Sequence, residues 1–303
     1  MTAKNPINGV LIVNKPAGIS SNKCLQIAKR FLNADKAGHT GSLDPLACGV
    51  LPLCFGEATK AAQYLLDSDK TYRTVVELGV KTVSGDRDGA IVETREVPEF
   101  TSEQILAVLE QFKGTITQQP SIYSALKQNG VPLYKLARAG KEIIPKFRDI
   151  NIIALDLLRW ERPELELRVR CSKGSYIRTL AEDIGEKLGT GAHLSFLQRE
   201  EAGPFALANS ITLEQLEALV AAGAALPASV LLPIDLPLQH LPALQLNQAE
   251  TRCLQQGKLV ALATPQTDGI TRVYCDAVFI GIGEVKDGNS LSAKRLLSYS
   301  TTQ

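Results

Sequence analysis

Hydrophobic and polar residues alternate along several short segments of the chain. In the segment 164–171 every second residue is apolar, and the residues between are charged; the apolar ones are Leu165, Leu167, Val169 and Cys171. Tyr72 to Val80 alternates in the same way, and Gly9 to Val13 is short and apolar throughout. Because successive side chains of a strand point to opposite faces, these patterns predict strands, the first two buried mainly on one face.

Other segments repeat their apolar residues at the spacing of a helix. Leu25, Ala28 and Leu32 would share one face of a helix that Ser20 or Ser21 caps. Two further segments show such spacing: 105–112 and 177–188, the second ending near a glycine. Strands and helices mixed in this order predict an α+β protein with a largely antiparallel sheet and flanking helices.

Four prolines crowd one segment toward the C-terminus: Pro227, Pro233, Pro237 and Pro242. Proline cannot donate a backbone hydrogen bond, so the segment is interpreted as a linker. We place a domain boundary there, with one domain over 1–236 and another over 237–303. The second domain contains a helical stretch near 249–256 and the β-rich sequence TRVYCDAVFIGIGEV, which predicts a small β-barrel-like module.

Composition excludes several classes of protein. The 33 lysines and arginines nearly balance 32 acidic residues, leaving a net charge of +1, so any basic surface must be local. The 6 cysteines are scattered without a Cys-x-x-Cys pair, and with 3 histidines they predict no metal site and a reduced, cytoplasmic protein. No signal-peptide core opens the chain, and Pro227 and Pro233 interrupt the uncharged run 218–234, so no membrane anchor is expected.

The segment 121–150 is locally basic. It carries six lysines and arginines against two acids, a net charge of +4, with Tyr123 and Tyr134 interleaved. Cations beside aromatic rings suit a surface that follows phosphates and stacks on bases, although a solvated charged loop would have the same composition.

A single carboxylate, Asp44, stands in the glycine- and proline-rich stretch GHTGSLDPLACGVLPL. A turn or capping aspartate explains it without any function. A reactive carboxylate in such apolar surroundings would need a cation nearby, because burial disfavours its charge. Arg178, at the start of a predicted helix, could supply that cation or could simply face solvent. Tyr72 and His39 taken alone indicate little.

Five motifs in this order resemble the bacterial TruB family of tRNA pseudouridine synthases over essentially the whole chain. The motifs are NKPAGISS, AGHTGSLDPLACGVLPLCFGEATK, DKTYR, YSALKQNGVPLYKLARAG and CSKGSYIRTLAEDIGEKLGTGAH. The resemblance implies that Asp44 is the catalytic aspartate, that Tyr72 stacks on the target base and that Arg178 pairs with Asp44. It also implies substrate contacts for a wider set of residues: His39, Tyr176, Leu197, Lys15, Lys60, Lys127, Lys135 and Arg138.

The same resemblance implies the architecture and the substrate. The segment 120–150 would be an RNA-gripping insertion and the tail a PUA-like RNA-binding domain, in a monomer that acts on the uridine at position 55 in the T loop of tRNA. Such an isomerisation needs no cofactor and no metal. Two departures stand out: Ser121 replaces a second proline, which should loosen its loop, and Gln198 replaces a basic residue, which should remove a phosphate contact.

Three alternatives stay open at this point. A guide-RNA-dependent relative would modify ribosomal RNA within a complex, and a tRNA-folding chaperone would use the same surfaces without catalysis. A small-molecule enzyme of another class would leave the basic insertion and the tail unexplained.

Overall fold

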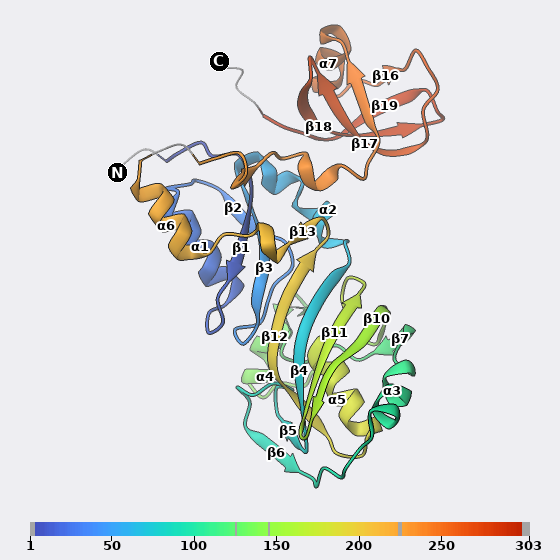
Figure 1. Ribbon diagram of the computed structural model, residues 1–303. Coiled ribbons are helices and arrows are strands. Elements are labelled where there is room, and N and C mark those ends of the chain that lie inside the picture. Colours follow the sequence, from blue (N-terminus) through green and yellow to red (C-terminus); the bar gives the residue numbers. More distant parts are fainter. Residues whose placement is uncertain (1–3, 125, 145, 224–225, 299–303) are drawn as a thin grey trace.

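The computed structural model describes residues 4–124, 126–144, 146–223 and 226–298, without the side chains of Leu65, Leu66 and Arg138. A large sheet runs through most of the molecule, and a second, smaller sheet lies at one end (Figure 1). The helices are α1 (Ser21–Phe31), α2 (Ala62–Leu66), α3 (Ser102–Glu110), α4 (Leu133–Arg138), α5 (Ile177–Lys187), α6 (Leu213–Ala221) and α7 (Gln248–Gln255).

The large sheet has ten strands in the described chain, and eight of them form the path β14-β1-β3-β12-β4-β11-β10-β7, with β13 beside β12 and β2 beside β3. Its strands are β1 (Gly9–Lys15), β2 (Ala37–His39), β3 (Cys48–Phe55), β4 (Lys70–Leu78), β7 (Gly114–Gln118), β10 (Arg148–Glu161), β11 (Glu164–Cys171), β12 (Ala192–Ala202), β13 (Phe205–Ala206) and β14 (Leu231–Leu232). All pairs are antiparallel except β12 with β3. The predicted α+β class and largely antiparallel sheet are confirmed.

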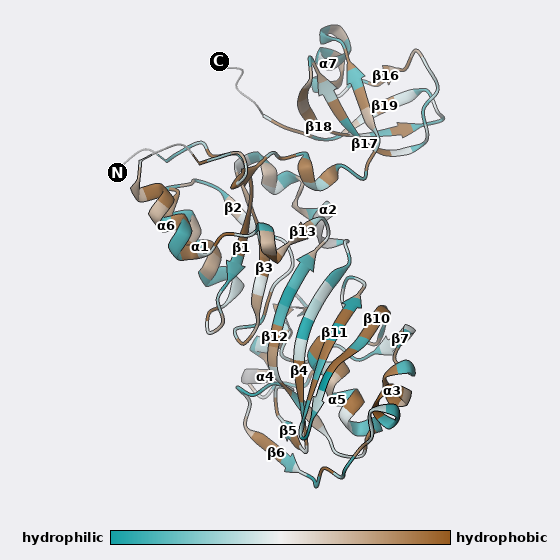
Figure 2. Cartoon of the chain, viewed as in Figure 1, coloured by the Kyte–Doolittle hydropathy of each residue, from teal (hydrophilic) through white to brown (hydrophobic). Residues whose placement is uncertain are grey.

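Apolar and polar residues alternate along the central strands, so that the apolar face of the sheet packs against the helices. In β11 the residues Leu165, Leu167, Val169 and Cys171 are buried, as their spacing predicts. Figure 2 shows hydrophobic and hydrophilic residues following one another along this strand. The predicted strand from Tyr72 to Val80 is broken at Gly79, whose φ of +89° turns the chain out of β4 into β5 (Val80–Thr82). A side chain at Gly79 would also meet Val97 Cγ2 at 2.7 Å.

The helices form where their caps and apolar faces predict them. Ser20 caps α1 by accepting a hydrogen bond from the Lys23 amide at 3.1 Å, and Leu25 and Ala28 bury the inner face. Helix α5 begins at Ile177 and buries that residue with Leu180, Ala181 and Ile184 against the sheet. Its position matters because the helix carries Arg178 in its first turn.

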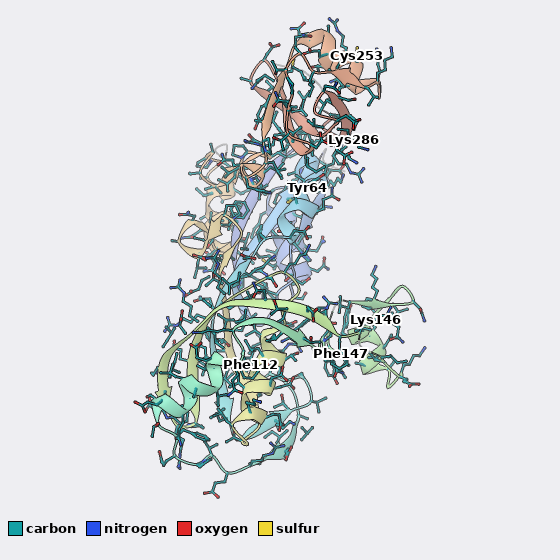
Figure 3. The ribbon with its side chains drawn as sticks, turned by 90° about the vertical axis from the view of Figure 1, so that its right-hand side faces the viewer. Tyr64, Phe112, Lys146, Phe147, Cys253 and Lys286 are labelled. Atoms are coloured by element: carbon teal, nitrogen blue, oxygen red, sulfur yellow. The ribbon has the colours of Figure 1, made fainter. Side chains whose placement is uncertain are left out.

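The basic insertion leaves the sheet between β7 and β10. It contains the short strands β8 (Lys127–Gln128) and β9 (Val131–Pro132), followed by α4. Asn129 and Gly130 connect the two strands with φ angles of +51° and +82°, as a two-residue hairpin turn requires. Figure 3 shows the segment with Lys146 and Phe147 projecting from the rest of the molecule.

The C-terminal sheet has the order β15-β17-β18-β19-β16. Its strands are β15 (Ala243–Leu246), β16 (Val260–Ala261), β17 (Gly269–Cys275), β18 (Val278–Lys286) and β19 (Ser290–Leu296), and α7 packs on them. The predicted small β module with a helix near 249–256 is therefore present.

The proline-rich segment that was interpreted as a linker is packed into an apolar core. Pro237 and Leu238 are buried in a short 3-10 turn. Leu238 belongs to an apolar cluster that contains Val10 and Phe205 of the large-sheet part and Phe279 of the small sheet. Since hydrophobic burial is shared across the boundary, the proline-rich segment joins the two parts instead of separating them.

Among the described residues no helix is both long and apolar enough to cross a bilayer. That same part of the chain shows no cluster of histidine, cysteine and acidic side chains suited to a metal ion. The six cysteines are free thiols.

Candidate active site

A cavity of about 560 Å³ opens on the large sheet where β4 and β12 pass the start of α5. Asp44, Tyr72, Tyr176, Arg178 and Leu197, five of the residues expected at the site, line it together. They come from a loop, two strands and a helix that are far apart in the sequence. The basic insertion also reaches the cavity, since Ser124 and Leu126 lie in its wall.

The loop that carries Asp44 is held by the segment before and within α1. The Ser21 hydroxyl accepts a hydrogen bond from the Leu43 amide at 2.7 Å and donates to the Leu43 carbonyl at 2.9 Å. The Gly18 amide donates to the Pro45 carbonyl at 2.7 Å. These contacts on both sides of Asp44 fix its backbone, so the carboxylate is presented by a constrained turn.

Arg178 is almost fully buried, with 4% of its side chain exposed, and its Nε lies 2.9 Å from Asp44 Oδ2. Three further N–H groups of the guanidinium donate hydrogen bonds. Nη1 donates to the Ser84 carbonyl at 2.8 Å and to Ser121 Oγ at 3.1 Å, and Nη2 donates to the Tyr123 carbonyl at 3.0 Å. A planar group with five donors can hold three segments at once in this way. Arg178 thereby ties the loop of Asp44 to the base of the insertion.

A second acid, Asp86, lies 3.9 Å from Arg178 Nε and is buried. Its Oδ1 accepts from the Ser84 hydroxyl at 2.5 Å. Asp86 was not among the residues expected at the site, although an acid within the glycine-containing stretch SGDRDG was a signal that could have been weighed.

Two effects act on the charge of Asp44. Burial raises the pKa of its carboxyl above the ordinary value, and Arg178 opposes that rise through charge and hydrogen bonding. The carboxylate still reaches the cavity, since 39% of the side chain is exposed. The group is thus largely enclosed by protein and open on the side where a ligand would enter.

Tyr72, another residue expected at the site, is held by a second buried arginine, Arg199. Tyr72 on β4 is 9% exposed and its hydroxyl is hydrogen-bonded to Arg199. Arg199 donates from Nε to the Val50 carbonyl at 2.7 Å and from Nη2 to the Gly41 carbonyl at 3.0 Å. Arg199 was not expected at the site either, because a lone arginine in an alternating strand carries no distinctive signal. Its contacts link the strand of Tyr72 to the loop of Asp44.

Three expected substrate contacts lie elsewhere. Lys15 is fully buried, and its ammonium donates to the Pro16 carbonyl at 2.8 Å and the Ile19 carbonyl at 2.7 Å. Lys60 bonds Glu57 at 2.7 Å and the Leu296 carbonyl of the small sheet at 3.0 Å. His39 does not line the cavity, and its Nδ1 is buried without a hydrogen-bond partner among the described residues. In this structure Lys15 and Lys60 support the protein's own backbone.

The predicted cations of the insertion are arranged around its hairpin and helix. Lys127 begins β8 and Lys135 lies on α4, both exposed to solvent. The side chain of Arg138 lies outside the described residues.

The two departures from the family pattern have local consequences. Ser121 Oγ accepts hydrogen bonds from Arg178 and from the Tyr123 amide, the latter at 3.2 Å. The serine in place of a second proline was expected to loosen this loop, but its hydroxyl instead holds the loop by two hydrogen bonds. Gln198 hydrogen-bonds the Cys48 thiol.

Family models cover nearly the whole chain. The N-terminal domain of TruB family pseudouridylate synthases matches residues 29–177, the C-terminal domain of tRNA pseudouridylate synthase B matches 178–239, and a TruB pseudouridine synthase II C-terminal model matches 242–297. Together with the cavity and its Asp44–Arg178 pair, these matches define the class as pseudouridine synthases, which are isomerases. The chain belongs to the TruB family.

The chain is also similar in sequence to curated proteins over nearly its whole length. The chain is 49% identical over 296 residues to tRNA pseudouridine synthase B of Stutzerimonas stutzeri strain A1501, covering 97% of each chain. It is 48% identical over 298 residues to the enzyme of that name from Pseudomonas aeruginosa strain UCBPP-PA14, again covering 97% of each.

Solved structures share the fold. One described as an H/ACA RNP bound to a substrate RNA containing 2'-deoxyuridine has a TM-score of 0.73 at 23% identity, covering 97% of this chain and 86% of the other. A Cbf5-Nop10-Gar1 complex has a TM-score of 0.72 at 25% identity, covering 95% of this chain and 84% of the other.

Proposed function

We propose that this protein converts uridine to pseudouridine at position 55 in the T loop of tRNA. The observation that carries the proposal is the Asp44–Arg178 ion pair at 2.9 Å on the wall of a cavity that Tyr72 also lines. The relatives from Stutzerimonas and Pseudomonas bear the name tRNA pseudouridine synthase B. A cytoplasmic monomer that needs no cofactor remains the prediction of the sequence.

The chemistry is a rearrangement without net change in composition. The bond from N1 of uracil to C1′ of ribose breaks, the base turns, and a bond from C5 to C1′ forms. C5 then loses its hydrogen as a proton, and N1 gains one. Asp44 can serve this sequence as a nucleophile at C1′ or as a base at C2′.

The neighbours of Asp44 suit either role. Arg178 orients the carboxylate and favours its charged form, in opposition to burial, which raises its pKa. Leu197 and the ring of Tyr72 give the cavity apolar walls, which limit the access of water to a reactive sugar.

The target base must leave the T loop to reach Asp44. Extruding a base costs about a few kcal/mol, and stacking on an aromatic side chain returns about 1–3 kcal/mol per base. Tyr72, which lines the cavity together with Asp44, would take that role. The exposed lysines of the insertion, Lys127 and Lys135, would hold the phosphates of the surrounding RNA.

The test is incubation of the purified protein with an unmodified tRNA transcript that carries tritium at C5 of uridine. Release of tritium to water, with pseudouridine mapped to position 55, is the expected result in the absence of any guide RNA. Conversion only with an added guide RNA would support the guide-dependent alternative. Binding and refolding of tRNA with no tritium release would support the chaperone alternative.

A further inference from the structure

One arginine of the cavity, Arg148, makes neither an ion pair nor a side-chain hydrogen bond with the described residues. Arg148 is the first residue of β10, and it lines the cavity beside Ser172, Gly174 and Ser175. Its Nε is buried, and within the described part of the chain it meets no hydrogen-bond acceptor. A charged donor that is buried without an acceptor is destabilising. The position therefore calls for an acceptor from outside these residues.

The residues around Arg148 explain why it is unpaired. Asp149 follows directly but points to the other face of β10, where its carboxylate accepts from the Thr117 hydroxyl at 2.8 Å. On the cavity side the guanidinium passes over Gly174. A Cβ at that glycine would lie 3.2 Å from Arg148 Nη1. Gly174 thus leaves room for the guanidinium.

The cation is also fixed relative to the catalytic pair. Arg148 pairs in the sheet with Gln118 of β7, whose side-chain amide bonds both the amide of Tyr176 at 2.8 Å and its carbonyl at 3.0 Å. Asn151, also on β10, exchanges two 2.9 Å hydrogen bonds with Ser172. The start of β10 and the start of α5 therefore form one platform, so an anion held at Arg148 would have a set position relative to Arg178 and Asp44.

The other two arginines of the cavity already have partners, and this indicates which ligand Arg148 would bind. Arg178 is engaged by Asp44, and Arg199 donates to backbone carbonyls. Uracil and ribose are neutral, so the anionic group that enters the cavity with a target uridine is a phosphodiester. The arginine fork matches two phosphate oxygens.

Resting on the proposed function, we propose that Arg148 binds the phosphodiester adjoining the target uridine and thereby positions its ribose against Asp44. In the sequence Arg148 counts among the charges of the insertion, but the structure places it in the cavity wall. It acts as a positioning residue, distinct from the exposed lysines that hold the RNA from outside.

The experiment replaces, one at a time, the phosphates on either side of the target uridine in a T-stem-loop RNA by neutral methylphosphonates. For the wild-type protein we expect one replacement to lower affinity and single-turnover rate by about 10- to 100-fold. Arg148→Met should show a similar loss on the natural RNA and little further loss on the sensitive methylphosphonate. Arg162→Met is the matched control, because Arg162 lies exposed at the far end of the β10–β11 hairpin, paired with Glu99.

Several outcomes would overturn the proposal. One is a wild-type protein indifferent to both methylphosphonates, a measurement that does not depend on the folding of any variant. Another is an equal methylphosphonate penalty in wild type and Arg148→Met. A third is Arg148-dependent binding of uridine 5′-monophosphate without any methylphosphonate effect, which would assign the site to free nucleotides. If the wild type binds RNA but converts none, the proposed function fails, and the affinity measurements still decide the role of Arg148.

Discussion

At the scale of single residues, the proposed function depends on one ion pair, between Asp44 and Arg178. We predict that Asp44→Asn lowers the single-turnover rate by about 10³-fold or more, because an amide is neither a nucleophile nor a base of comparable strength. Affinity for tRNA should change by no more than a few-fold, since phosphate contacts hold the RNA. The fold should persist because Asp86 remains near Arg178.

The matched control for that variant is Asp156→Asn, an exposed acid on β10 away from the cavity. Quench-flow or manual quench assays of pseudouridine formation, with filter-binding measurements of affinity, separate the two quantities. An Asp44→Asn protein that kept more than a few per cent of the wild-type rate would remove Asp44 from the chemistry.

The second residue-scale prediction concerns pH. Arg178 lowers the pKa of Asp44 against the raising effect of burial, so Arg178→Met should raise that pKa. Activity that needs the carboxylate is lost as pH falls through its pKa, so the acidic limb of the rate profile should move to higher pH. The rate at its maximum should also fall by about 10²-fold or more. An acidic limb in its wild-type position would show that Arg178 serves structure alone.

At the scale of elements, the insertion between β7 and β10 has two functions in the proposed enzyme. Its base is bound to Arg178 through Ser121 and Tyr123, whereas its hairpin and α4 present exposed lysines. In the proposed enzyme, a short stretch of chain would connect the RNA-binding lysines of the hairpin to Arg178.

We predict that Lys127→Gln combined with Lys135→Gln reduces the slope of log affinity against log salt concentration. The expected reduction is about 0.7–0.9 for each lysine–phosphate ion pair that the substitutions remove. The single-turnover rate at saturating RNA should be nearly unchanged, because neither lysine lines the cavity. Lys113→Gln with Lys187→Gln removes the same charge away from the cavity and should leave the slope as in the wild type. Equal slopes for both double variants would contradict an RNA-binding role for the hairpin.

At the scale of the whole molecule, the small sheet is packed onto the catalytic part. Phe279, Ile282 and Leu297 of the C-terminal part share an apolar cluster with Val10 and other residues of the large sheet. Tyr274 also donates to Asp235 at 2.7 Å across the boundary. Cutting the chain near Pro237 would expose this apolar surface. We therefore expect residues 1–236, the catalytic part, to be less stable without the C-terminal sheet.

We predict that Phe279→Ala lowers the free energy of unfolding of the catalytic part by about 2 kcal/mol or more, because an aromatic side chain is removed from a shared core. Val278→Ala is the control, since Val278 is its neighbour and is 55% exposed. The chain has one tryptophan, Trp160 on β10, so its fluorescence during urea unfolding reports on the catalytic part alone. Identical midpoints for the two variants would show that the parts are energetically independent.

Local patterns in the sequence were enough to predict much of the fold. The strand at 164–171, the helix that Ser20 caps and the β-rich tail all depend on periodicity and capping, which act between residues a few positions apart. The motifs around Asp44, Tyr72 and Arg178 likewise named residues that the structure brings to one cavity. A short-range pattern fails where tertiary packing overrides it, as at Gly79 and in the buried turn at Pro237.

The sequence by itself determined the α+β class, the main elements and the motifs that carry Asp44, Tyr72 and Arg178. Only the tertiary structure decided which charged side chains found partners. Lys15 and Lys60 are satisfied by backbone carbonyls, whereas Arg148 is left facing a cavity. The physical reason is that the partners of a charged group come from segments distant in the chain, and their register and burial are set when the sheet assembles.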